Sequence, residues 1–235
     1  MQWTKVDSDQ VRRQGFALLP PLAPDLVARA KKMIDDDFAA YPPHSQADWD
    51  WARDNTFCAQ LADTHALDFL CFDSGAFEFA EGALGPLSRS VTAQIARRRQ
   101  GNLGRPHIDG FYPKDQEPAD TPDAVLGIYL TDVLAADDGA FETWPDQRAM
   151  VKSWARNFRG TPPRATPEIE IANPEDGRAL LGPKGTAFLV HGALPHRNAM
   201  RKTATGYRDA VFFRFYRLPP KRDVLALLQS GAAGW

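Results

Sequence analysis

The sequence has few cysteines, no long hydrophobic run and no excess of charge of either sign. Its 235 residues include two cysteines, Cys58 and Cys71, and carry a formal net charge of −2. We expect free, buried thiols rather than a disulfide, in a reducing cytoplasm. The near balance of charges argues against nucleic acid or an anionic membrane surface as a partner.

The sequence also has no segment that resembles a membrane-spanning helix or a secretory signal. No apolar run approaches the ~18 residues that a membrane-spanning helix needs. The opening residues, MQWTKVD, have no apolar core of the kind found in secretory signals. Hydrophobic residues make up 43% of the chain, which is ordinary for a globular protein, and the length fits one domain over residues 1–235.

Short apolar runs between Asp/Gly and Pro/Gly turns predict a protein made mainly of strands. The expected strands are 16–19, 91–99, 124–131, 141–144, 169–171, 179–181, 186–190 and 207–217. Helices are expected from Asp25 onward, over 64–84 and over 146–159, with 46–63 as an irregular aromatic segment packed on the sheets. Sandwiched strands with flanking helices predict a double-stranded β-helix, which is a cupin-like jelly roll.

A histidine and an aspartate stand two positions apart at His107 and Asp109. On an extended chain such residues point to the same side, so the imidazole and the carboxylate can aim at one point. A further histidine arrives much later, at His191 or His196. Two histidines and one carboxylate on one face of a metal form the facial triad of non-haem Fe(II) oxygenases, with the opposite positions open.

The last predicted strand carries an arginine in an unusual setting. A period of two places Arg208, Ala210, Phe212 and Arg214 on one face, and the other face is apolar as well. A charge on a buried face needs a partner. The guanidinium of Arg208 could therefore clamp a dicarboxylate by a two-pronged salt bridge.

The order of these residues resembles that of the Fe(II)/2-oxoglutarate-dependent dioxygenases, and within them the phytanoyl-CoA dioxygenase-like family. The segment GTAFLVHGALPHRNAM…GYRDAVFFRF is similar to the closing part of that family, and QGFALLPPLAPDLVARAKK resembles its entry strand and first helix. The resemblance covers most of the chain. It departs after GAFETWP, where Asp146-Gln147-Arg148 stands in place of the usual Gly-Ser-His.

The resemblance implies a complete set of site residues. The metal ligands would be His107, Asp109 and His196, and His191 would either support the ligands or be a packed histidine at the end of a strand. Arg208 would bind 2-oxoglutarate, and Tyr129 would either join it or be a packed core residue. Fe(II) and 2-oxoglutarate would be the cofactors, with O2 as co-substrate.

The reaction implied is the oxidation of a small molecule with release of succinate and CO2. Because halogenating relatives lack the carboxylate, Asp109 favours hydroxylation or a related oxidation such as desaturation or cyclisation. The alternative is a cupin-type metal-binding β-barrel with isomerase, lyase or binding activity and no 2-oxoglutarate. Only the oxygenase needs a dicarboxylate clamp such as Arg208.

Other residues are expected to face the substrate, which the arginines suggest is anionic or zwitterionic. The substrate-binding candidates are Arg105, Phe111, Trp144 and Arg214, and Arg98 and Arg148 add to the positive charge. The run Arg97-Arg98-Arg99 indicates either a solvated face or one arginine that points into the barrel to meet an anionic substrate or 2-oxoglutarate. The proline-rich loop 111–122 directly follows two candidate ligands and is the expected lid.

Overall fold

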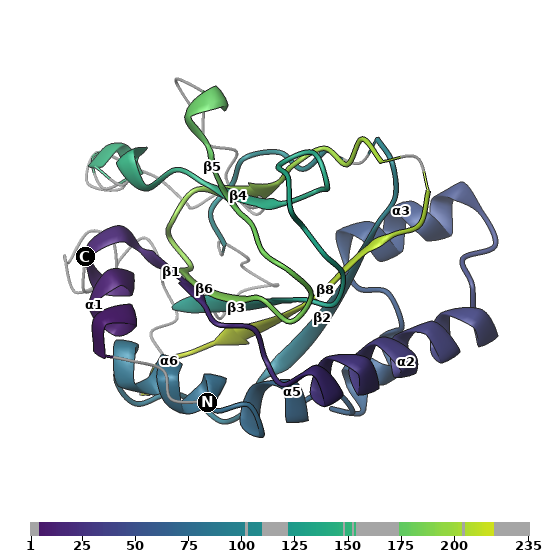
Figure 1. Cartoon of the computed structure of the whole chain (residues 1–235), viewed down its shortest axis with the longest axis horizontal. Helices are drawn as coiled ribbons and strands as arrows, with labels where there is room; N and C mark the ends of the chain where they lie inside the picture. Colours follow the sequence, from purple (N-terminus) through teal and green to yellow (C-terminus); the bar gives the residue numbers. More distant parts are fainter. Residues whose placement is uncertain are drawn as a thin grey trace, which may run out of the picture.

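Two antiparallel β-sheets face each other at the centre of the protein, and helices cover the outer face of the larger sheet (Figure 1). The computed structural model describes residues 5–101, 103–109, 122–147, 149–151, 153, 174–203 and 205–218. The five-stranded sheet has the order β1 (Phe16–Leu19), β6 (Ala187–His191), β3 (Ala124–Tyr129), β8 (Arg208–Phe215) and β2 (Thr92–Arg98). The three-stranded sheet has the order β5 (Arg178–Leu180), β4 (Phe141–Thr143) and β7 (His196–Asn198).

Within the described residues, almost all helices lie in the first third of the chain. They are α1 (Lys5–Gln14), α2 (Pro24–Ala40), α3 (Gln46–Asp54), α4 (Ala59–Asp63), α5 (Phe69–Phe72) and α6 (Ala76–Leu84), and the short 3-10 turns η1 (Pro145–Gln147) and η2 (Pro174–Asp176) follow later. Helix α2 begins with Pro24 in its first turn, where the missing N–H costs nothing, and buries Val27, Ala30 and Ile34. These residues belong to the hydrophobic core between the large sheet and the helices.

Alternate residues of β8 belong to two different cores. Val211, Phe213 and Phe215 pack between the large sheet and the helices. Ala210 and Phe212 pack between the two sheets. The predicted division of this strand into two apolar faces is confirmed, and it places Arg208 and Arg214 on the face toward the space between the sheets.

The region 46–63 was wrongly expected to be irregular. It contains α3 and α4, and α3 begins with a capping box in which the Ser45 side chain accepts from the Asp48 N–H and the Asp48 side chain accepts from the Ser45 N–H. Helix α1 and strand β7 were not expected either. The expected strand 169–171, most of the helix 146–159 and the lid segment 111–121 lie outside the described residues.

None of the helices in the described ranges is long and apolar enough to cross a membrane. Both cysteines are free thiols, as expected: Cys71 is buried and Cys58 is partly buried. The extent of a single domain over the whole of 1–235 stays a prediction.

Candidate metal centre

Strand pairing places His107 directly opposite His196. The N–H of His107 donates to the carbonyl of His196 at 2.9 Å, and the N–H of His196 donates back at 2.8 Å. The segment around His107 thereby extends the small sheet beyond β7. Two residues later, the N–H of Asp109 donates to the carbonyl of Gly192 at 3.0 Å. Backbone hydrogen bonds thus set the positions of all three side chains.

The three side chains converge on one point. Each of His107, Asp109 and His196 offers a ligand atom, and these atoms lie within 4.8 Å of one another. Asp109 Oδ1 is 3.9 Å from His107 Nε2 and 3.6 Å from His196 Nε2. Two atoms that each bind one ion at ~2.1 Å lie at most ~4.2 Å apart, so both separations are compatible with a shared metal.

Each histidine ring is oriented by the backbone two residues before it. His107 Nδ1 lies 2.7 Å from the carbonyl of Arg105, and His196 Nδ1 lies 2.8 Å from the carbonyl of Leu194. A carbonyl only accepts, so the proton belongs on Nδ1 in both rings. The Nε2 lone pairs are then available to a metal, as expected of a ligand set with fixed tautomers.

The protonation states also suit a metal. Burial by itself would raise the pKa of Asp109, but its contact with His196 and the charge of Arg214 outweigh burial, so this pKa lies well below the ordinary range. Burial, followed by the neighbouring His196, lowers the pKa of His107 to about 4. At neutral pH Asp109 is therefore an anion and His107 a neutral imidazole, which are the forms that bind metals.

His191 does not join the group. It ends β6, is 5% exposed, and its Nδ1 accepts a hydrogen bond from the N–H of Ala193 at 3.2 Å. Its backbone N–H donates to Gly15 at 2.7 Å, which ties β6 to the start of β1. Of the two histidines left open by the residues alone, His196 is the one that lies with His107 and Asp109.

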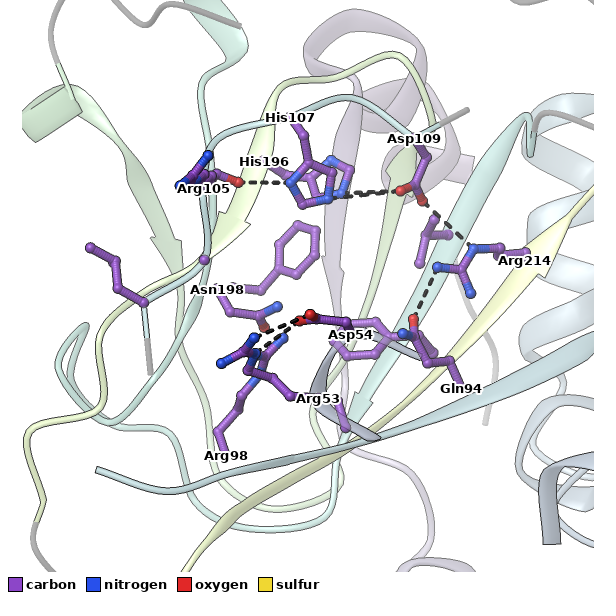
Figure 2. Close-up of a pocket in the computed structure, with 16 residues that line it drawn as sticks. Arg53, Asp54, Gln94, Arg98, Arg105, His107, Asp109, His196, Asn198 and Arg214 are labelled. Carbon is purple, nitrogen blue, oxygen red and sulfur yellow. Dashed lines mark hydrogen bonds and ion pairs between the residues drawn. The ribbon is translucent and has the colours of Figure 1, made fainter. Parts of the chain in front are cut away.

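A polar cavity of about 570 Å³ opens in front of the three side chains (Figure 2). Four arginines line it, against two carboxylates, Asp54 and Asp109; the arginines are Arg53, Arg98, Arg105 and Arg214. The excess of positive charge favours an anionic occupant. Arg105 and Arg214, which the sequence suggested as substrate-binding residues, both line this cavity.

Arg208 lies just behind the cavity wall. It is 1% exposed; its Nε donates to the carbonyl of Gly139 at 2.9 Å and its Nη2 to Asn198 Oδ1 at 2.5 Å. Its Nη1 is buried and has no hydrogen-bond partner among the described residues. A buried guanidinium N–H without an acceptor is costly, so this atom is suited to an anionic ligand.

Two other predicted residues are placed differently. The Tyr129 hydroxyl donates to the carbonyl of Leu180 at 2.9 Å and accepts from the N–H of Phe141 at 2.8 Å, and the residue does not line the cavity. Because the hydroxyl already donates and accepts inside the core, unlike Nη1 of Arg208, this favours the packed core role over a contact with 2-oxoglutarate. Trp144 is 1% exposed under Arg197 and is also absent from the lining. Phe111 and Arg148 lie outside the described residues.

Some lining residues were missed from the sequence. Arg53 and Asp54 reach the cavity from the last turn of α3, and Gln94 reaches it from β2. The signal for α3 was present in Ser45 and Asp48, the two ends of its capping box. Gln94 has no such signal, because polar residues on a strand are usually solvated.

A comparison with protein-family models found no match to this chain, and neither did a comparison with curated proteins. Solved structures do match. HygX from Streptomyces hygroscopicus, with nickel and 2-oxoglutarate bound, has 15% sequence identity and a TM-score of 0.60, and the match covers 93% of this chain and 88% of that one. The chain has the same fold.

Two proteins of nogalamycin biosynthesis are similar as well. The non-haem α-ketoglutarate-dependent carbocyclase SnoK has 15% identity, a TM-score of 0.65, and coverage of 91% and 84% of the two chains. The non-haem α-ketoglutarate-dependent epimerase SnoN has 15% identity and a TM-score of 0.62, and the match covers 91% of this chain and 82% of that one. The jelly roll with flanking helices expected from the sequence is thus confirmed.

Proposed function

We propose that this protein is a non-haem Fe(II)/2-oxoglutarate-dependent oxygenase, similar to the phytanoyl-CoA dioxygenase-like family, that oxidises a small molecule. The observation that carries the proposal is the convergence of His107, Asp109 and His196 within 4.8 Å at the wall of a positively lined cavity. The structural neighbours support it, because HygX binds 2-oxoglutarate on the same fold.

The donor set fits iron. Two imidazole nitrogens and one carboxylate on one face of an ion leave the remaining positions open, which is the arrangement of non-haem Fe(II) oxygenases. Iron bound here with 2-oxoglutarate and O2 would supply the oxidising power for attack on a C–H bond, with succinate and CO2 as co-products. The chain itself holds the ligands in place through the backbone contacts of His107 and His196.

Arg208 is proposed to bind the far carboxylate of 2-oxoglutarate. Its Nη1 has no partner within the described part of the chain, and its other contacts hold the guanidinium still. A cupin-type protein that does not use 2-oxoglutarate would have no need for a buried arginine of this kind, so the oxygenase is favoured over that alternative.

The substrate is proposed to be an anionic or zwitterionic small molecule that meets Arg105 and Arg214. Both line the cavity, and Figure 2 shows Arg214 beside Asp109, next to the candidate metal. The reaction would be hydroxylation, desaturation or cyclisation, since one fold supports several outcomes. Both cysteines are free, which favours the reducing cytoplasm as the location.

The proposal is tested by following 2-oxoglutarate and succinate in the presence of Fe(II), O2 and a panel of candidate metabolites. We expect slow release of succinate from the protein alone and faster release with the true substrate. Anionic metabolites should stimulate release more than neutral analogues of the same size. A protein that binds Fe(II) but never converts 2-oxoglutarate, alone or with any metabolite, would support the cupin alternative.

A further inference from the structure

Strands β2 and β8 place two arginines directly opposite each other. In the antiparallel register Arg98 pairs with Arg208. Directly opposed residues of neighbouring strands have Cβ atoms only ~4.5–5.5 Å apart, and like charges in such pairs are destabilising. The register therefore creates an unfavourable pair of positive charges beside the cavity.

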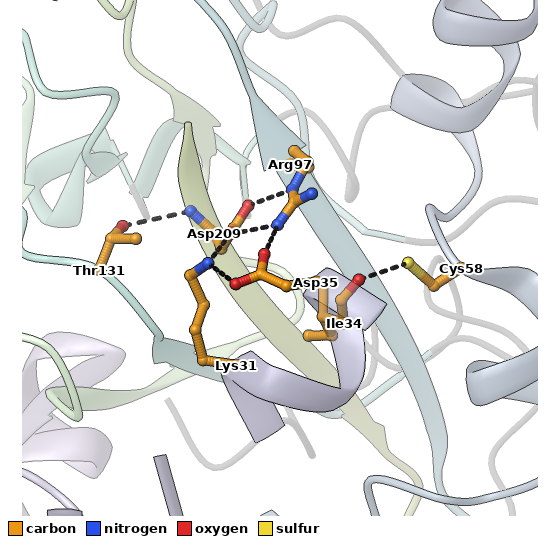
Figure 3. A network of polar contacts seen from close by, with 7 residues as sticks. All are labelled: Lys31, Ile34, Asp35, Cys58, Arg97, Thr131 and Asp209. Carbon is orange, nitrogen blue, oxygen red and sulfur yellow. Dashed lines mark hydrogen bonds and ion pairs between the residues drawn. The ribbon is translucent and has the colours of Figure 1, made fainter. Parts of the chain in front are cut away.

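The neighbouring pair, Arg97 and Asp209, favours this register of β2 and β8 despite the repulsion between Arg98 and Arg208. Arg97 is opposite Asp209, and its Nε and Nη2 each donate to one carboxylate oxygen at 2.8 Å (Figure 3). The side chains are 3% and 1% exposed, and Asp35 and Lys31 of α2 join them. This ion pair lies on the helix-covered face of the sheet, so a slip that relieved Arg98 and Arg208 would break it.

Both arginines of the unfavourable pair have hydrogen-bond capacity to spare. Arg98 Nε and Arg208 Nη1 are buried, and neither has a partner among the residues that the structure describes. Burial, and then the charge of Arg208, lowers the pKa of Arg98 to about 9. An anion held between the two guanidinium groups would supply the missing acceptor and offset the repulsion.

Arg98 is the member of the pair that the cavity exposes. It lines the cavity together with Asn198, which accepts from Arg208 Nη2, whereas Arg208 lies behind the wall. Figure 2 shows Arg98 beside Asn198, well away from Arg214 and Asp109. The cavity thus has two positive ends, one at Arg98 and one at Arg214.

We propose that Arg98 and Arg208 together bind the far carboxylate of 2-oxoglutarate, with Arg98 as the contact that selects a dicarboxylate. The inference rests on the proposed function. Arg98 is assigned to the co-substrate because it is opposite Arg208, and Arg214 is left for the substrate because it lies near Asp109 and donates to Gln94. A 2-oxo acid without the second carboxylate would then bind without help from Arg98.

The test compares 2-oxoglutarate with 2-oxopentanoate, which has the same chain length and lacks the far carboxylate. Binding of each to the Ni(II)-loaded protein is measured by calorimetry for wild type, Arg98→Gln and Arg99→Gln. Arg99 is the matched control, because it is next in sequence but stacks on Trp49 outside the cavity. We expect Arg98→Gln to weaken 2-oxoglutarate binding by about 10–100-fold, the scale of a lost hydrogen bond to a charged group.

The remaining outcomes separate the inference from the proposed function. The dissociation constant of 2-oxopentanoate should change by no more than about twofold in Arg98→Gln, because this ligand has no far carboxylate for Arg98 to contact. A lost contact worth ~1.4 kcal/mol would change it tenfold. An equal loss for both 2-oxo acids, or an unchanged preference for 2-oxoglutarate, would overturn the role of Arg98. A wild-type protein that shows no preference between the two would instead overturn the proposed function.

A thermal denaturation series distinguishes binding from a structural role. Without ligand, Arg98→Gln should be at least as stable as wild type, because the substitution removes the repulsion from Arg208. The rise in Tm on adding 2-oxoglutarate should be smaller for Arg98→Gln than for wild type. The rise for Arg98→Lys should lie between these two values. A large loss of stability in the ligand-free Arg98→Gln and Arg98→Lys proteins would show a structural role and overturn the inference.

Discussion

The Asp109 Oδ2 atom lies 4.0 Å from Arg214 Nε, while Asp109 Oδ1 faces the two histidines. One carboxylate oxygen thus faces Arg214 on β8, and the other faces the candidate metal position. Burial acts to raise the pKa of Asp109, but His196 and then the charge of Arg214 lower it by more. One residue is thus predicted both to orient a metal ligand and to meet the substrate.

This double role predicts a loss of metal affinity when the cation is removed. We expect Arg214→Gln to weaken metal binding by about tenfold, at the low end of the range for groups that support a ligand. Titration of the metal-free protein with Ni(II) measures this. Arg53→Gln also removes a positive charge from the cavity wall, but Arg53 pairs with Asp50 and Asp54 and should leave the affinity unchanged. Equal affinities for wild type and Arg214→Gln would contradict the orienting role.

Arg208 is predicted to act on 2-oxoglutarate and not on the metal. Arg208→Ala should raise the KM for 2-oxoglutarate by about 10–100-fold, and Arg208→Lys should fall between it and wild type because the charge stays and the fork is lost. Fe(II) affinity should hardly change. Steady-state kinetics with varied 2-oxoglutarate check this. If the KM for 2-oxoglutarate rose steeply in Arg214→Ala and did not rise in Arg208→Ala, the carboxylate clamp would have been assigned to the wrong arginine.

The faces of strand β8, the pairing of His107 with Asp109 and the inward position of Arg208 were predictable, because each depends on spacing within an extended segment. The choice of His196 over His191 came from the resemblance to a known family and not from spacing. The assembly of His107 with His196 required the pairing of distant segments, which local pattern does not determine. Trp144 was expected near the site, and Tyr129 was expected either there or in the core; both are buried away from the cavity wall. Their direction depends on how β3 and β4 pack, which the sequence pattern leaves open.

The run Arg97-Arg98-Arg99 shows the same limit. The sequence left two alternatives open, a solvated face or one arginine that points into the barrel. In the structure the three side chains have three different environments: Arg97 is in a buried ion pair, Arg98 lines the cavity and Arg99 stacks on Trp49. Charge alone cannot distinguish these environments. The partners of Arg97 lie far away in sequence, in α2 and β8.

The buried ion pair gives a prediction about stability. Asp209→Asn removes the buried partner of Arg97 and leaves this cation with only the half-exposed Asp35, so we expect a loss toward the low end of ~3–5 kcal/mol in the free energy of unfolding. Urea denaturation measures it. Asp36→Asn is the control, because it breaks an exposed pair with Lys32 and should cost at most ~1 kcal/mol. Similar small losses in both variants would contradict the anchoring role of Asp209.

The cysteines are predicted to react slowly in the folded protein. Burial, and then Asp37, raises the pKa of Cys58 to about 12, and burial raises the pKa of Cys71 as well. The thiolate is the reactive form, so alkylation at pH 8 should be much slower in the native than in the unfolded protein and should quicken as the pH rises toward 12. Mass spectrometry after timed exposure to iodoacetamide measures both rates. Rapid native labelling of Cys58 at pH 8 would contradict this.

The most direct test of the account is 2-oxoglutarate consumption by iron-loaded wild type, His196→Ala and His191→Ala under one set of conditions. We predict that wild type and His191→Ala convert 2-oxoglutarate to succinate and that His196→Ala neither converts it nor retains Fe(II). The reason is that His196 Nε2 lies with His107 and Asp109, whereas His191 Nδ1 already accepts from the backbone. Undiminished conversion in His196→Ala would contradict the proposed metal centre.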